Sequence, residues 1–326
     1  PIIDPISGNI TYHANDIRKY LPIFFNLWMT NRNAKDINYL LSLIRKISEG
    51  ALDELCKNQE TIKMGKYGIF NEEQYRFITN QLVLTSKIPK RDERQEIYVK
   101  ELIEMIINSL NSKHAFEKEG SFDMLKTFFS SIRTLVHPSN SGQWSTLLSK
   151  AVKRTAVLYH SRLLEEKEDR QLCHNYLNDY SNLPQDYKLS IEMTNDFIDM
   201  LDPIIKLGIQ SKSSSQRNRY IAALEVLCFM DSNRVLNSML LEIYASFDTI
   251  NSTHRINVVL RELQVLSRFM VMIPVFRTHV PRLLSMLLPG IDSNDPDKTI
   301  LTVQFVKTVA SVIPFYDLTN GNGDGG

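Results

Sequence analysis

Amphipathic helical patterning, repeated along most of the chain, is the feature that most constrains the fold. Apolar residues recur at helical spacing in nine segments, at about residues 35–57, 97–110, 122–132, 190–208, 217–230, 232–247, 253–272, 276–288 and 295–313. Alternation with a period of two, which marks strands, is nearly absent. The chain is therefore predicted to be all-α.

The spacing of these segments predicts how the helices pack. Two helices joined by a short turn bury only one face each, so they need neighbours on both sides and stack into a solenoid. Helix pairs at 222–247 and 255–288, with a further helix beginning at Thr299, indicate a repeat of about 40 residues, the HEAT and armadillo range. We predict an all-α, HEAT/armadillo-like helical-repeat solenoid.

The regularity of the pattern changes along the chain and predicts its organisation. Residues 1–120 read as helical segments with irregular HEAT-like repeats, and residues 121–318 read as HEAT-like repeats. Residues 319–326 are rich in glycine, which cannot sustain a helix. We expect them to form the edge of a flexible loop.

Helix starts carry plausible caps. Asn71 precedes two glutamates, Ser121 precedes the helix at Phe122, and Asn294 and Asp295 precede a proline. Such short polar side chains accept hydrogen bonds from the first free backbone N–H groups of a helix. The sequence therefore predicts helix starts at these positions.

Charge and cysteine content exclude several classes of protein. Lysine plus arginine number 38 and aspartate plus glutamate 37, which gives no support for a nucleic-acid-binding surface. No run approaches the roughly 20 apolar residues that span a bilayer, so no membrane is expected. The three cysteines, Cys56, Cys173 and Cys228, are far apart and odd in number, which favours a reducing compartment. Because the first residue is Pro1, the chain is expected to be part of a longer polypeptide.

No catalytic signature occurs in the sequence. It has no P-loop, dinucleotide fingerprint, nucleophile elbow or zinc-protease motif. Cys173 and His174 are adjacent, but adjacent helical residues point about 100° apart and do not easily grip one metal ion. A cysteine nucleophile at Cys173, with His160 or His174 as its base, is the enzymatic alternative. We expect no enzyme, no cofactor and no metal.

Paired carboxylates occur in three highly charged places. General acid and base catalysis needs a desolvated carboxylate in a pocket, so we interpret these pairs as solvated surface. The pairs are Glu165/Glu166, Asp53/Glu54 and Glu117/Glu119.

One segment differs from ordinary helix sequence. His137 precedes Pro138, which biases it away from the helical region. Asn140 offers a side-chain cap for the next helix, Gly142 allows close backbone approach, and Trp144 begins an apolar face. The segment is predicted to form a rigid, capped corner between helices.

Two motifs carry a resemblance to a known family. Residues 137–144, His-Pro-Ser-Asn-Ser-Gly-Gln-Trp, resemble a corner of the large HEAT-repeat proteasome activators of the bleomycin-sensitivity type, the proteasome activator subunit four family. Residues 288–295, with Pro289, Gly290, Asp292 and Asn294, resemble a second stretch of that family. The resemblance covers about residues 121–318.

The resemblance implies a function without catalysis. Members form a helical-repeat dome that caps the 20S proteasome core particle at its α-subunit ring and promotes gate opening for peptides and unfolded proteins without ATP. Their docking tail, with its penultimate tyrosine, is not in this segment. Roles in proteasome assembly and DNA repair and a location in nucleus and cytoplasm are implied. Inositol phosphate is linked to the family elsewhere in the full protein, and no residue set for it maps here.

A different HEAT-repeat interaction scaffold is the alternative. Nuclear-transport receptors and phosphatase scaffolds share the helical pattern, because one fold serves many functions. We do not expect the two motifs above in them.

Overall fold

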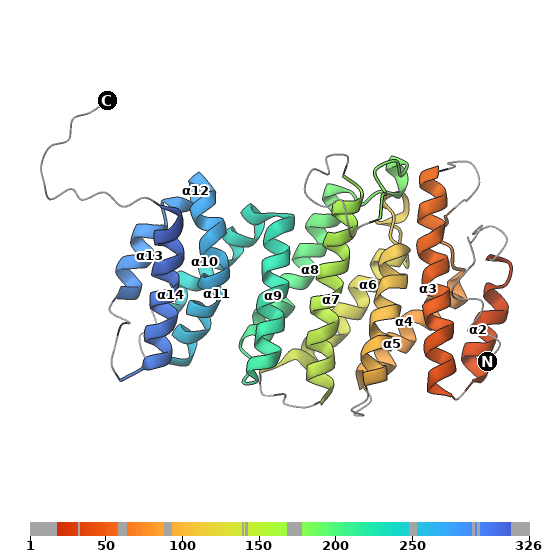
Figure 1. Ribbon diagram of the computed structural model, residues 1–326, viewed down its shortest axis with the longest axis horizontal. Coiled ribbons are helices and arrows are strands. Elements are labelled where there is room, and N and C mark those ends of the chain that lie inside the picture. Colours follow the sequence, from red (N-terminus) through yellow and green to blue (C-terminus); the bar gives the residue numbers. More distant parts are fainter. Residues whose placement is uncertain are drawn as a thin grey trace, which may run out of the picture. The chain divides into compact units, whose positions relative to one another are not determined.

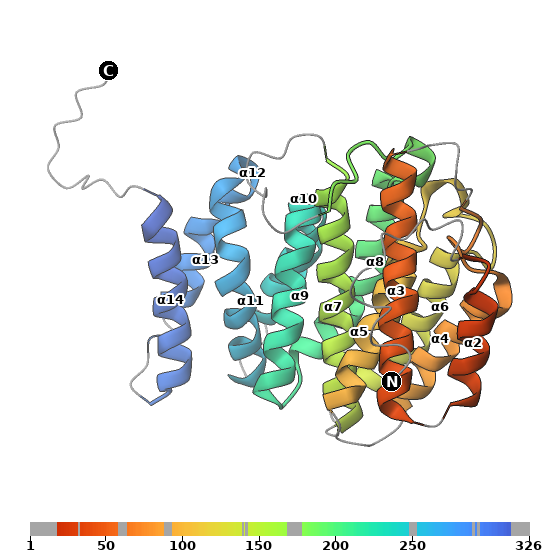
Figure 2. The same ribbon diagram turned by 45° about the vertical axis from the view of Figure 1, so that its right-hand side comes forward.

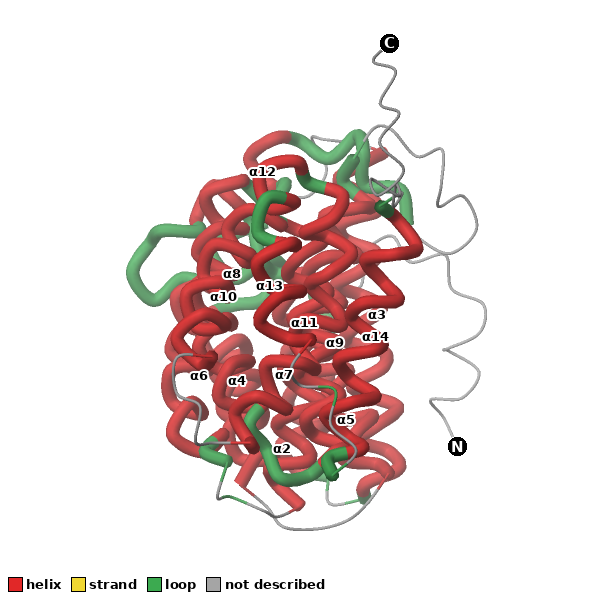
Figure 3. The backbone as a smooth tube through the Cα atoms, turned by 90° about the vertical axis from the view of Figure 1, so that its left-hand side faces the viewer, coloured by secondary structure: helices red, strands yellow, loops and turns green. Residues whose placement is uncertain are grey.

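The computed structural model describes residues 18–31, 33–57, 64–87, 93–138, 140, 143–167, 178–247, 253–288, 291 and 294–313. These residues form helices and connecting loops, and no strand occurs among them (Figure 3). An isolated antiparallel bridge pairs Gly65 with Gly68. The prediction of an all-α fold is confirmed.

The chain divides into two compact units, residues 1–226 and 227–326. Each unit has its own set of packed helices and is described by itself below. The boundaries predicted near residues 120 and 318 concern the extent of the family-like repeats and stay predictions. The Gly-rich residues 319–326 lie outside the described residues.

The described residues of the first unit form eight long helices, of which α9 continues past the boundary of the unit. They are α2 (Leu21–Thr30), α3 (Ala34–Lys57), α4 (Glu72–Lys87), α5 (Glu93–Asn108), α6 (Ser121–Arg133), α7 (Gln143–Glu165), α8 (Ile191–Ile209) and α9 (Ser214–Met230). Helices α3, α5 and α7 pack in sequence as one layer, while α4, α6 and α8 form a second layer behind them (Figures 1 and 2). This two-layer stacking is what helical repeats require to bury both sides of each pair.

Aromatic side chains fill the space between the two layers. Tyr159 of α7 stacks on Phe197 of α8 with ring centroids 3.8 Å apart, and neither ring is exposed. Tyr75 of α4 is fully buried and its hydroxyl donates to the Ser121 carbonyl over 3.1 Å. Buried aromatic rings of this size dominate core stability, and their polar ends usually find a partner.

The second unit contains α10 (Ser232–Phe247), α11 (Thr253–Met272), α12 (Pro274–Arg277), α13 (Val280–Leu287) and α14 (Pro296–Val312). Helix α11 packs along α14 and also contacts α10 and α12. The bounds of α10 and α11 equal the predicted ranges 232–247 and 253–272. A HEAT-like pairing of helices is thus present in this unit too.

The single helix predicted at 276–288 is wrong. Residues 274–287 form two short helices, α12 and α13, separated at Thr278 and His279. Pro281 lacks an N–H, so it cannot donate to the carbonyl four residues earlier. Ile273 is extended before Pro274, at φ −96° and ψ 116°, which ends α11.

Some of the predicted helix caps are confirmed, and one is wrong. The Asn71 side chain accepts from the Gln74 N–H over 2.8 Å, and the Asp295 side chain accepts from the Lys298 N–H over 3.0 Å, so both caps are confirmed. The cap at Ser121 is wrong. Gly120 is the capping residue of α6, and the Ser121 hydroxyl instead donates to the Ser109 carbonyl.

Among the described helices, none combines the length and apolar character needed to cross a bilayer.

Candidate functional site

The predicted corner lies between α6 and α7, and its described part is held by local hydrogen bonds. His137 is exposed and extended, at φ −61° and ψ 138°, as expected before Pro138. The Asn140 N–H donates to the His137 carbonyl over 2.8 Å, and its side-chain amide donates to the Leu135 carbonyl over 3.1 Å. Asn140 therefore ties the corner to the preceding turn. Gly142 lies outside the described residues.

Trp144 stands in the first turn of α7 and is half-buried. Leu147 and Leu148, which follow it on the predicted apolar face, are buried. The corner thus begins an apolar helix face, but the indole itself keeps contact with solvent.

Little of the second motif is described. Pro289, Gly290 and Asp292 lie outside the described residues, and Asn294 is exposed. The structure therefore leaves the roles predicted for these four residues untested.

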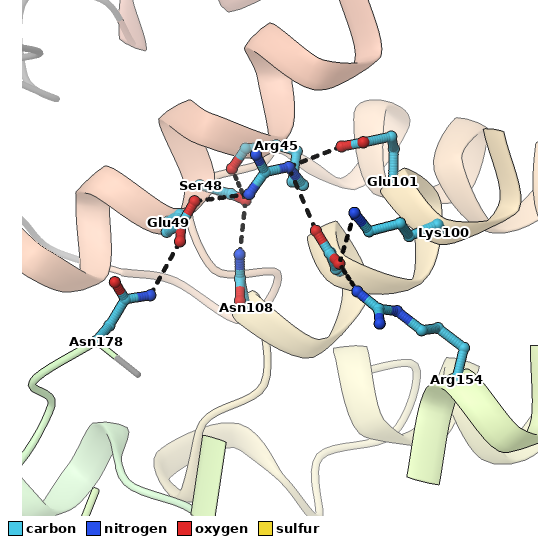
Figure 4. A network of polar contacts seen from close by, with 9 residues as sticks. Arg45, Ser48, Glu49, Lys100, Glu101, Asn108, Arg154 and Asn178 are labelled. Atoms are coloured by element: carbon cyan, nitrogen blue, oxygen red, sulfur yellow. Dashed lines mark hydrogen bonds and ion pairs between the residues drawn. The ribbon is translucent and has the colours of Figure 1, made fainter. Parts of the chain in front are cut away.

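A polar network in the first unit brings together charged side chains that sequence reasoning missed (Figure 4). Arg45 of α3 lies 2.6 Å from Glu49, 2.7 Å from Glu101 and 3.3 Å from Glu104, measured from guanidinium nitrogen to carboxylate oxygen. The contact to Glu101 is an ion pair without hydrogen-bond geometry. Because Glu101 and Glu104 belong to α5, Arg45 joins α3 to α5.

The network continues from Glu104 to the next helix of the same layer. Glu104 pairs with Arg154 of α7 and lies 3.9 Å from Lys100. On the other side, the Asn178 amide donates to Glu49 over 2.9 Å. Ion pairs therefore connect three successive helices of one layer, α3, α5 and α7.

Burial shapes the electrostatics of this network. Burial alone would lower the pKa of Arg45, but Glu101, Glu49 and Glu104 together raise it. Burial raises the pKa of Glu101, and the attraction of Arg45 offsets this only in part. The carboxylates thus hold Arg45 in its charged form, which suits a cross-link between helices.

A second buried pair lies at the end of α7. The Arg162 Nε donates to Glu166 Oε1 over 2.9 Å, and the Leu189 N–H donates to Glu166 Oε2 over 2.7 Å. Glu166 is buried, so its interpretation as solvated surface is wrong: Arg162, one helical turn earlier, compensates its charge. Glu117 and Glu119 are exposed, as predicted.

The other predicted surface carboxylates, Glu165, Asp53 and Glu54, are half-buried rather than fully solvated. Burial raises the pKa of Glu165 to about 7, against the smaller opposing effects of the Asn178 backbone and Arg162. Burial, followed by repulsion from Glu49, also raises the pKa of Asp53. Asp53 forms a hydrogen bond with the Tyr180 side chain and Glu165 one with the Asn178 backbone, so both carboxyls face segment 178–190.

The cysteine alternative falls largely outside the described residues, because both Cys173 and His174 do. His160 is half-buried, and burial lowers its pKa. Burial and nearby carboxylates raise the pKa of Cys56 to about 11, which keeps that thiol protonated near neutrality. In the described part of the chain, no three His, Cys, Asp or Glu side chains group as metal ligands.

Sequence reasoning missed the network because its members are far apart in the chain. A local signal existed for the pairs one helical turn apart, which are Arg45 with Glu49, Lys100 with Glu104, and Arg162 with Glu166. Nothing in the sequence marks Arg154 as a partner of Glu104, 50 residues away.

Comparison with known proteins agrees with the resemblance. A family model described as "Proteasome activator complex subunit 4, mid HEAT repeats region" matches residues 125–325. "Proteasome activator BLM10" of Saccharomyces cerevisiae is 25% identical over 320 residues, a match that covers 94% of this chain and 14% of that protein. "Proteasome activator complex subunit 4" of Homo sapiens and of Xenopus laevis are each 28% identical over 200 residues, covering 60% of this chain and 10% of the relative.

The chain thus spans a small part of the length of these relatives. The matched region includes both sequence motifs and extends over helices of both units. The family model covers more than half of the 326 residues. Together with the two-layer helical repeats, this match shows that the chain belongs to the HEAT-repeat proteasome activator family, proteasome activator complex subunit 4.

Proposed function

We propose that this chain is a wall segment of a proteasome activator that caps the 20S core particle. In this proposal the full-length protein promotes gate opening at the α-subunit ring without ATP, and so admits peptides and unfolded proteins. The match of residues 125–325 to the middle HEAT-repeat region of the family is the observation that carries it.

The arrangement of the helices supports an architectural role. Stacked helix pairs present extended surfaces. Each repeat packs against its neighbours, so its position is set by theirs. In the first unit, the ion pairs of Arg45, Glu104 and Arg154 join α3, α5 and α7, and the Tyr159–Phe197 stack joins α7 to the second layer. Such cross-links suit a segment that holds a shape and carries out no chemistry itself.

A location in nucleus and cytoplasm belongs to the same proposal. Fractionation of cells that express a tagged full-length protein tests it. Detection of the protein in one compartment alone would contradict it.

Association with the core particle is tested on the full-length protein. It is mixed with purified 20S particles and run on a native gel, with an unrelated HEAT-repeat scaffold of similar size as the control. The proposal predicts a slower-migrating 20S band that contains the protein, whereas the control leaves the band unchanged. If the protein does not associate with 20S particles even at low ionic strength, the proposal is wrong, and the protein is a HEAT-repeat scaffold with a different partner.

A further inference from the structure

A pocket in the first unit combines a basic rim with apolar walls. It lies among α5, α7 and α9 and has a volume of about 590 Å³, within the range of ligand-binding pockets. Its apolar lining comes from Ile97, Val99, Leu147 and Val157. Val99 and Leu147 are buried, while Ile97 is 47% exposed, so the apolar surface runs from the floor of the pocket to its mouth.

Five cationic side chains line the same pocket, and no carboxylate is among the described residues that line it. They are Lys100, Lys150, Lys153, Arg154 and Arg219. Four of the residues of α7 that line the pocket lie on one face of the helix, because positions 147, 150, 154 and 157 are three or four residues apart. On this face of α7, Lys150 and Arg154 therefore lie between the apolar Leu147 and Val157.

Polar contacts hold three of these five cations, Arg154, Lys100 and Arg219. Glu104, which is not among the residues that line the pocket, pairs with Arg154 and Lys100 and also with Arg45. Arg219 donates to the neutral Ser149 hydroxyl over 3.3 Å. Lys150 lies near Arg219 in the lining of the pocket.

The cations on the α9 side are held close together. Burial, followed by repulsion from Arg219, lowers the pKa of Lys150. Like charges that are kept near one another favour the arrival of an anionic group, because that group relieves their repulsion. Lys153 is exposed and extends the basic rim toward solvent.

We propose that this pocket docks an acidic peptide segment that inserts one large apolar side chain between Ile97, Leu147 and Val157 while its carboxylates meet Lys150, Lys153 and Arg219. The occupant is a peptide rather than a small inorganic anion because the pocket offers apolar walls as well as cations. A carboxylate series spaced along an extended backbone also fits cations that come from two helices. The inference does not depend on the proposed function, and its test needs no core particle.

Fluorescence anisotropy on the full-length protein tests the proposal. The probe is a short labelled peptide in which aspartates and glutamates flank one leucine. One comparison peptide has serine in place of the leucine. The other has asparagine and glutamine in place of the aspartates and glutamates. The leucine peptide is expected to bind at least about tenfold more tightly than either comparison peptide, and more weakly as salt rises.

Variants locate the binding. The double variant Lys150→Glu with Arg219→Glu is expected to lose at least about tenfold in affinity. The matched control carries the same charge change on the exposed lysines of the same unit, Lys118→Glu with Lys212→Glu, and is expected to bind like the unmodified protein. If the pocket variant fails to fold, the single variant Lys153→Glu, at an exposed position, is tested in its place. It is expected to bind the leucine peptide several-fold more weakly.

Three results would overturn the proposal. They are absence of binding, equal loss in the pocket and control variants, and equal binding of the leucine and serine peptides. In the last case, displacement of both peptides by inorganic tripolyphosphate would identify a site for anions alone.

Discussion

Arg162, in the last turn of α7, and Glu166, directly after that helix, form an ion pair with Nε 2.9 Å from Oε1 and side chains only 3% and 5% exposed. The remaining donors of Arg162 reach the carbonyl of Ile107 and, over 3.0 Å, that of Tyr187. The pair thus fastens the end of α5 and segment 178–190 to α7. A buried charge pair of this kind is costly to break from one side.

Arg162→Met is expected to lower the free energy of unfolding by about 3–5 kcal/mol, because it leaves the Glu166 carboxylate buried without its partner. Urea unfolding measures the loss. The matched control is Arg76→Met, which breaks exposed ion pairs with Glu72 and Glu119 and should lower the free energy of unfolding far less. Equal losses in the two variants would show that the burial of the Arg162 pair has no energetic consequence.

Gly208 sets the approach of α8 to α9 in the first unit. A Cβ at this position would meet the ring of Tyr220, which is buried. Gly208→Ala is therefore expected to cost about 1–3 kcal/mol through overpacking. Gly50, inside α3, has no atom within 4 Å of its would-be Cβ. Gly50→Ala should instead stabilise by about 0.5–1 kcal/mol, because alanine favours the helix.

Melting temperatures of the two alanine variants check this contrast. Opposite shifts are expected, upward for position 50 and downward for position 208. A rise for both would mean that α8 and α9 adjust around an added methyl group at no cost.

The raised pKa of Glu165 predicts a pH dependence of stability. Its pKa rises from the usual 4.5 to about 7 on folding, so the folded chain binds this proton more tightly than the unfolded chain. Stability from this group is therefore lost as pH rises from about 4.5 to about 7. Glu165→Gln should be more stable than the unmodified chain at pH 8, by about 1 kcal/mol after solvent screening, and similar at pH 4.

The difference in unfolding free energy between the two proteins, measured across this pH range, isolates the contribution of Glu165. Other groups that titrate, such as Asp53, are present in both proteins, so their contributions cancel in the difference. A stability difference that stays constant with pH would contradict the raised pKa.

Trp144→Ala is expected to cost about 1–2 kcal/mol, because the indole is half-buried and only part of its apolar area leaves water on folding. Full burial would instead predict about 3–5 kcal/mol. Thermal unfolding distinguishes these ranges. An unchanged melting temperature would contradict the interpretation of residues 137–144 as a structural corner.

Helix content and most helix bounds could be predicted from the sequence, since they depend on local periodicity and capping. Asn71 and Asp295 could be recognised as caps because each acts within three residues. The break between α12 and α13 depends on a proline effect that the apolar pattern alone conceals. Helix periodicity therefore predicts where a helix exists better than where it is interrupted.

Side-chain partnerships across helices could not be predicted. Glu166 reads as one more charge in a charged run until α7 turns it toward Arg162 and Leu189. The basic pocket likewise needs α9 beside α7 to bring Arg219 near Lys150, 69 residues earlier in the chain. Such pairings are set by the packing of repeats, which a single sequence does not reveal.

We propose that the full-length protein activates the 20S core particle. Hydrolysis of short fluorogenic peptides by gated 20S particles, with the protein added and ATP removed by apyrase, tests it most directly. Faster hydrolysis that saturates with added protein and is unaffected by ATP removal is expected. Unchanged hydrolysis by particles that have bound the protein, or acceleration that requires ATP, would contradict it.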